Sequence, residues 1–113
     1  MKIERILYHL AEKYGDEFNW RIIASIESQG AFVDELRREL GDDDKIFQSS
    51  LSVVAKCDSN DDVLFSLRDE RNGELWRVYH LTYTANNAPG FPRYEEFTSE
   101  EAVGQWIEHQ FLR

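Results

Sequence analysis

The stretch from Val63 to Thr84 constrains the fold of this 113-residue chain more than any other. Two runs rich in aromatic and aliphatic residues flank the dipeptide Asn72-Gly73. Asn-Gly favours a two-residue type I′ turn, because both central residues of that turn need a positive φ. The sequence therefore predicts a β-hairpin in which Arg71 faces Glu74 and each step outward pairs the next two residues.

That pairing predicts which side chains share a face, since side chains alternate along a strand. One face carries four large apolar residues and is the expected core: Phe65, Leu67, Trp76 and Val78. On the other face Arg68 lies opposite Arg77. Like charges directly opposed destabilise a sheet, so we expect an acid beside this pair, with Glu70 or Glu95 as intramolecular candidates.

The composition is that of one acidic globular domain spanning residues 1–113. Asp and Glu number 22 against 13 Lys and Arg, which gives a formal charge of −9. Such a chain repels nucleic acid and anionic membranes and attracts a basic protein. Its one cysteine, Cys57, excludes an intrachain disulfide and suits the reducing cytoplasm. The first residues lack a signal-peptide pattern, and no run is long enough to span a membrane.

The first third of the chain predicts two or three helices. Apolar residues at helical spacing predict an amphipathic first helix that ends near Gly15. The segment Phe18–Glu27 fits both a helix and an alternating strand, and we favour a helix because Asp16 precedes it and Gly30 follows it. A further helix ends at Gly41.

The rest of the chain predicts strands and one last helix. Strict alternation from Phe47 to Cys57 predicts a half-buried strand, and Tyr94–Phe97 predicts a short edge strand after the loop 86–90. Thr98-Ser-Glu-Glu101 is typical of a capping box that starts a C-terminal helix. The expected fold is therefore α+β: N-terminal helices, a three- to four-stranded antiparallel meander, and a C-terminal helix on one sheet face.

No motif indicates catalysis, a cofactor or a metal. The segment Asp58–Asp62 imitates the start of a calcium loop, but it lacks the required glycine and glutamate and predicts a solvated turn. Cys57 is expected to be a small buried side chain, and His80 a core histidine opposite Phe65. A nucleophilic Cys57–His80 pair lacks any local signature. The three histidines share no metal-ligand spacing: His9, His80 and His109.

Acidic residues at one end of the meander are the best candidate for a binding surface. The loop before the first predicted strand and the hairpin tip should lie at the same end of the sheet. A tryptophan beside the tip is a candidate anchor. The plain alternative is a solvated cluster of loop charges. The candidate partner-binding residues are Asp42, Asp43, Asp44, Asp69, Glu70, Glu74 and Trp76.

In size, acidity, single cysteine and α+β pattern the chain resembles the small immunity proteins of bacterial toxin systems. These proteins neutralise a cognate toxin, often a basic nuclease, by one-to-one binding in the cytoplasm. The resemblance implies a non-catalytic inhibitor. Two alternatives remain open. In the first, the chain is a ligand-binding domain or enzyme in which Arg68, Arg77 and Tyr79 bind an anionic small molecule. In the second, it is a regulatory protein that dimerises through Tyr94–Phe97.

Overall fold

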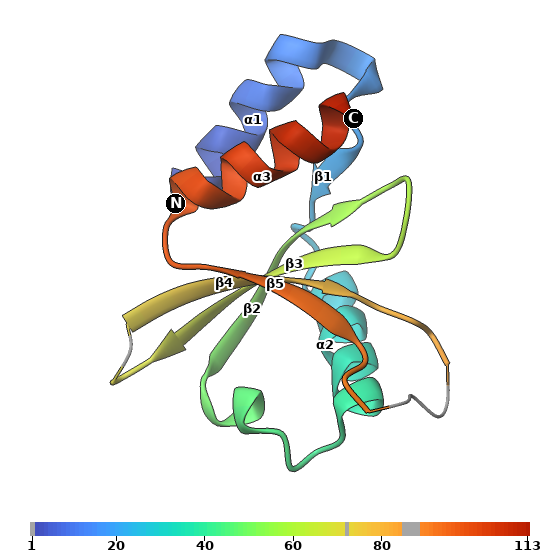
Figure 1. The fold of residues 1–113 in the computed structure, drawn as a ribbon, viewed down its shortest axis with the longest axis vertical. Coiled ribbons are helices and arrows are strands. Elements are labelled where there is room, and N and C mark those ends of the chain that lie inside the picture. Colours follow the sequence, from blue (N-terminus) through green and yellow to red (C-terminus); the bar gives the residue numbers. More distant parts are fainter. Residues whose placement is uncertain (1, 72, 85–88) are drawn as a thin grey trace.

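Three α-helices and one five-stranded sheet form the fold in the computed structural model, which describes residues 2–71, 73–84 and 89–113 (Figure 1). The expected α+β class is confirmed, with five antiparallel strands instead of three or four. The elements are α1 (Lys2–Tyr14), η1 (Gly15–Glu17), β1 (Trp20–Ile22), α2 (Ile26–Leu40), η2 (Lys45–Gln48), β2 (Ser50–Cys57), β3 (Asp62–Asp69), β4 (Gly73–His80), β5 (Arg93–Phe97) and α3 (Glu100–Leu112).

The extra strand is β1, and it corrects the helix predicted for Phe18–Glu27. The five strands follow one another in chain order across the sheet, and Trp20 of β1 pairs with Cys57 of β2. Helix α2 begins only at Ile26, where the Ser25 hydroxyl accepts a hydrogen bond from the amide of Ser28 at 3.3 Å. Pairing with β2 and burial of Trp20 outweigh the helical spacing of this segment.

The register of β3 against β4 differs from the predicted one by three residues. Asp69 pairs with Gly73, whereas a two-residue turn would have placed Asp69 opposite Trp76. Gly73 has φ of +72°, and Asn72, the other half of the predicted turn, lies outside the described residues. Because the shift is odd, Trp76 and Val78 move to the opposite face from the one shared with Phe65.

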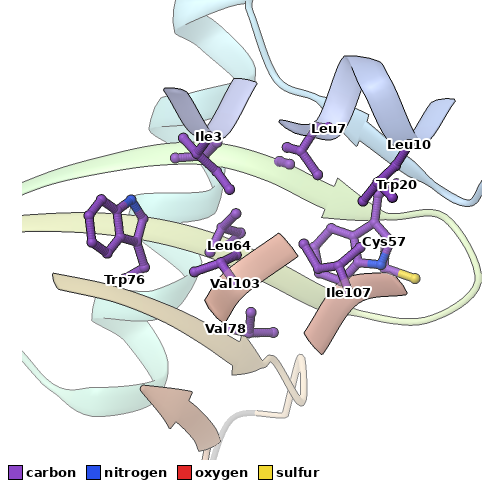
Figure 2. Close-up of a cluster of buried hydrophobic side chains, with 12 residues drawn as sticks. Ile3, Leu7, Leu10, Trp20, Cys57, Leu64, Trp76, Val78, Val103 and Ile107 are labelled. Atoms are coloured by element: carbon purple, nitrogen blue, oxygen red, sulfur yellow. The ribbon is translucent and has the colours of Figure 1, made fainter. Parts of the chain in front are cut away.

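As a result both faces of the sheet are buried. The C-terminal helix packs on one face, as expected, but α2 packs on the other, so the helices are not confined to one side. Helices α1 and α3 cover one face and α2 covers the other (Figure 1). Figure 2 shows the first cluster, whose buried members are Ile3, Leu7, Leu10, Trp20, Val54, Ala55, Cys57, Leu64, Trp76, Val78, Val103 and Ile107. The second cluster consists of Ile23, Leu36, Ile46, Val53, Val63, Phe65, Leu67, Tyr79 and Leu81.

A β-bulge in β2 divides its apolar residues between the two clusters. Val53 pairs with Phe65 and Ala55 with Leu64, which leaves Val54 as the extra residue. Val53 therefore faces α2, while Ala55 and Cys57 face α1 and α3. The single alternating face predicted from Phe47 to Cys57 is thus wrong, but burial of Cys57 is confirmed at 3% exposure.

Helix α3 begins one residue later than the predicted capping box. Its N-cap is Ser99, whose hydroxyl accepts a hydrogen bond from the amide of Ala102 at 3.1 Å. The two acids of the box instead reach α1: Glu100 accepts the backbone amide of Ile3, and Glu101 pairs with Lys2 at 3.0 Å. The first turn of α3 therefore fixes the start of α1.

The close packing of α1 on α3 depends on Gly104. A β-carbon at this position would lie 2.5 Å from Cγ2 of Ile6. We expect Gly104→Ala to lower the free energy of unfolding by about 1–3 kcal/mol, because overpacking displaces a helix and exceeds the gain in helix propensity. Denaturant unfolding of the purified variant measures this change.

The same substitution made in an Ile6→Ala background provides the control. There the clashing Cγ2 is absent, so Gly104→Ala should stabilise the protein by about 0.5–1 kcal/mol through helix propensity alone. An equal loss of stability in both backgrounds would contradict the steric explanation.

Candidate functional site

The structure brings together one acid from each of the two predicted groups, Asp44 and Asp69, whereas Asp42 lines a separate hollow with Arg37 and Arg38 of α2. Ser50 at the start of β2 pairs with Arg68 near the end of β3, so the loop before β2 approaches the hairpin tip. Asp44 and Asp69 line one hollow of about 680 Å³. Asp44 caps η2 by accepting the amide of Ile46 at 3.0 Å, and Asp69 accepts the amide of Arg71 at 2.8 Å.

The acids at this end differ in how far they reach solvent. The exposed ones are Asp42, Asp43 and Glu70, while Asp44, Asp69 and Glu74 are half-buried. Asp42 is 3.7 Å from Arg37, and its side chain is 80% exposed. Lys45 and Arg71 line the same hollow as Asp44. Arg77 lines it as well, so two acids and three cations among the described residues surround the hollow, and the other acids lie on the surface around it.

Trp76 is not an exposed anchor beside this surface, and that prediction is corrected. Its side chain is 4% exposed and packs in the cluster under α1 and α3 (Figure 2). The register shift explains the difference, because it turns Trp76 from the face of Phe65 to that of Leu64. The indole nitrogen is buried and has no hydrogen-bond partner among the described residues.

Arg77 is held by three contacts on the α2 side of the sheet. Its guanidinium donates to the Tyr79 hydroxyl at 2.7 Å and to the Glu96 carboxylate at 2.9 Å. It also lies over the ring of Tyr94, 4.2 Å from the ring centroid. The acid expected beside Arg77 is therefore present, but it is Glu96 of β5 and not Glu70 or Glu95.

Arg68 belongs to a different surface, so the predicted anion site is not assembled. Its cross-strand partner is Glu74 and not Arg77, and the alternation of β3 places it on the opposite face from Phe65 and Arg77. Arg68 lines a separate hollow of about 540 Å³ together with Glu4, Gln29, Ser50, Ser52, Val53, Val54, Ser66 and Glu74. The structure brings Arg77 and Tyr79 together and leaves Arg68 apart.

His80 lies at the end of β4 and not in the core opposite Phe65. It pairs with Asp62, and its Nδ1 donates to the Asp62 carboxylate at 2.5 Å. The imidazole is about a third exposed and lines a hollow of about 600 Å³ that also contains Phe91 and Tyr94. The predicted register does not contain this pair, because it places Phe65 opposite His80, whereas Phe65 pairs with Arg77.

A buried carboxylate on α2 fixes the segment that follows β4. Glu39 accepts hydrogen bonds from the amides of Thr82 and Tyr83 at 2.8 and 3.0 Å. Burial acts to raise the pKa of Glu39, but hydrogen bonds from Glu35, Thr82 and Tyr83 outweigh it and lower that pKa. These bonds hold Tyr83 at φ of +54°, an uncommon conformation for a side chain of this size.

The remaining candidates have structural roles. Asp58 pairs with Arg21 at 2.7 Å, and the Asn60 side chain accepts the amide of Asp62, as expected for a turn. Burial raises the pKa of the Cys57 thiol, which opposes activation as a nucleophile. Within the described ranges, no three His, Cys, Asp or Glu side chains are grouped to hold a metal ion.

Comparisons with protein-family models, with curated proteins and with solved structures found no match to this chain. Among the residues described above, no helix has both the length and the apolar character needed to cross a bilayer.

The His80–Asp62 pair should make stability depend on pH. The hydrogen bond to Asp62 raises the pKa of His80 above its ordinary value of 6.5, and the charges of Asp62 and Glu95 add to this effect against burial and Arg93. A raised folded-state pKa stabilises the fold fully below about pH 6.5, and the stabilisation is lost as pH rises through the folded value.

We therefore expect His80→Gln to cost more stability at about pH 6 than at about pH 9, measured by urea unfolding across that range. Asp62→Asn should remove the same part of the pH dependence. A difference between wild type and His80→Gln that stays constant with pH would contradict this role of the pair.

Proposed function

We propose that this protein is a non-catalytic binding protein that neutralises a basic protein by direct contact, in the manner of immunity proteins that inhibit bacterial toxins. The observation that carries the proposal is the charge of −9 together with the position of two carboxylates beside the hairpin. Asp44 and Asp69, which are far apart in the sequence, line the same hollow. The formal charge of −9 gives the whole chain the sign that such a partner requires.

Electrostatic steering accounts for how such a surface works. Opposite charges on two proteins raise the rate of productive encounter, and the effect weakens as salt screens them. Acids at the hairpin end would occupy the place of the phosphates that a nuclease binds, or would cover the rim of its active site. The partner class proposed is accordingly a basic protein, with a nuclease toxin as its most specific form.

The fixed groups around the hollow would supply discrimination. Asp44 and Asp69 are held by backbone amides, so their carboxylates keep a set position. Lys45, Arg71 and Arg77 place positive charges beside these acids, and a wrongly placed cation on a competing protein would be repelled there. Because Cys57 is the one cysteine and is buried as a thiol, the cytoplasm is the compartment we propose.

Neutralising three exposed acids, two in the loop before η2 and one at the hairpin, tests the proposal. We expect the triple variant Asp42→Asn, Asp43→Asn, Glu70→Gln to lower the association rate with the protein encoded by the adjacent gene by about tenfold at low salt. The dependence of the rate on salt should also become shallower. Stopped-flow association measured at several salt concentrations gives both quantities.

A matched variant carries the same charge change at the other end of the molecule. Glu12, Asp16 and Glu17 are exposed near the end of α1, which lies opposite the loop before η2 along the longest axis (Figure 1). Their replacement by Gln, Asn and Gln should change the rate by less than about twofold. Equal rates for the two triple variants, or no complex with the adjacent gene product and with a panel of basic nucleases, would reject the proposal.

A further inference from the structure

The outer edge of β2 is open along half of its length. Strand β1 pairs only with Ala55–Cys57, and a bond from the amide of Ile23 to the Val54 carbonyl at 3.0 Å extends the pairing by one residue. Beyond that point Ser50–Val53 has no strand on its outer side within the described part of the chain. Ser50–Val53 is therefore an open edge of the sheet.

The open edge lacks the features that normally block pairing with another chain. Natural sheets protect edge strands with charged side chains, proline or bulges. The outermost strand β5 follows this rule with Arg93, Glu95 and Glu96 among its five residues. The open edge reads Ser-Leu-Ser-Val, with no charge and no proline, and the bulge at Val54 lies at its end.

A hollow of about 540 Å³ runs beside the open edge. It is lined by Ser50, Ser52 and Val53 of the edge itself and by Glu4 of α1 and Gln29 of α2. The amide nitrogen of Gln29 donates to the carbonyl of Ile23 at 2.8 Å, which fixes the side chain where β1 leads into α2. An unprotected strand edge and an adjoining hollow thus form one continuous surface.

We propose that the open edge accepts an extended, basic segment of a partner protein as an added β-strand. This inference rests on the proposed function, since it names how the basic partner is held. Backbone hydrogen bonds to Ser50–Val53 would supply affinity, and side chains on one face of the added strand would enter the hollow. The added strand would continue the line of β1 along β2.

The charges around the hollow favour a basic segment over a second copy of this chain. Glu4 and Glu74 line the hollow with one cation, Arg68. Two copies that each carry a formal charge of −9 repel each other, whereas lysine or arginine side chains of a partner are attracted. The occupant is therefore a cationic segment in extended conformation.

Peptides test the site with the full-length protein. The probe is a peptide of about eight residues that alternates Lys and Val, compared with a Glu–Val peptide and with Lys–Val peptides N-methylated at alternate residues. We expect only the unmethylated Lys–Val peptide to slow amide hydrogen exchange within residues 50–53, by about tenfold for the outward-pointing amides. Protection within residues 93–97 instead would overturn the assignment.

Two variants with the same change in net charge distinguish peptide binding at the open edge of β2 from binding at β5. Ser52→Lys adds a positive charge at the open edge, and Glu95→Gln removes a negative charge at β5. Ser52→Lys should weaken binding of the Lys–Val peptide by about tenfold, and Glu95→Gln by less than about twofold. Light scattering that reports a dimer of the free protein, abolished by Ser52→Lys, would assign the edge to a second copy and overturn the proposal.

The strand-addition proposal and the inhibitor function can fail independently of each other. If the adjacent gene product binds and Ser52→Lys leaves its affinity unchanged, the open-edge proposal fails while the inhibitor function stands. If the Lys–Val peptide protects residues 50–53 but no basic protein binds, the strand-addition site stands and the inhibitor function fails.

Discussion

Burial of β3 on both of its faces is the constraint on which the rest of the structure depends. Residues Val63–Leu67 are all buried, and β3 is the middle strand of the five. Leu64 points to α1 and α3, whereas Phe65 points to α2. Each of these side chains contributes about 1.5–3 kcal/mol when fully buried, so neither face of the sheet can be left to solvent. Two helical layers are the consequence.

The two helical layers do not cover the sheet to its ends, and the proposed binding surfaces lie where this cover stops. On the α1–α3 side, the face is apolar at Val78 and Leu64 and becomes polar toward the hairpin, at Ser66, Arg68 and Glu74. The hairpin projects beyond these helices (Figure 1). The same strands therefore supply core residues at one end and solvent-facing polar groups at the other.

Local signals in the sequence predicted the elements that local interactions determine. The first helix ends before Gly15, α2 ends before Gly41, and β5 spans the predicted edge strand. Both glycines have positive φ, at +67° and +90°, which explains why these ends were readable from the sequence.

The predicted hairpin register is wrong because apolar content can select a register only when one face of the sheet is exposed to solvent. The prediction assumes one buried face and one solvated face. Because both faces are buried, either register places large apolar residues in the core. The hydrophobic pattern therefore gives no reason to reject the two-residue turn that Asn-Gly favours. The observed register pairs Leu67 with Leu75 and Leu64 with Val78, and it separates Arg68 from Arg77. The errors at Trp76, His80 and the anion site all follow from this one shift.

The predicted fold leaves the whole outer edge of β2 open, because it contains no β1; the structure limits the open part to Ser50–Val53. In the proposed complex β2 joins the two parts of the contact surface. It begins beside the hairpin acids and continues along the open edge to the bulge. Backbone pairing along the edge is nearly independent of sequence, so it cannot by itself select a partner. Selection would then depend on the carboxylates at either side, Glu4 and Glu74 in the hollow beside the open edge and Asp44 and Asp69 in the hollow beside the hairpin. A surface of this kind combines affinity from the main chain with discrimination from a few well-placed carboxylates.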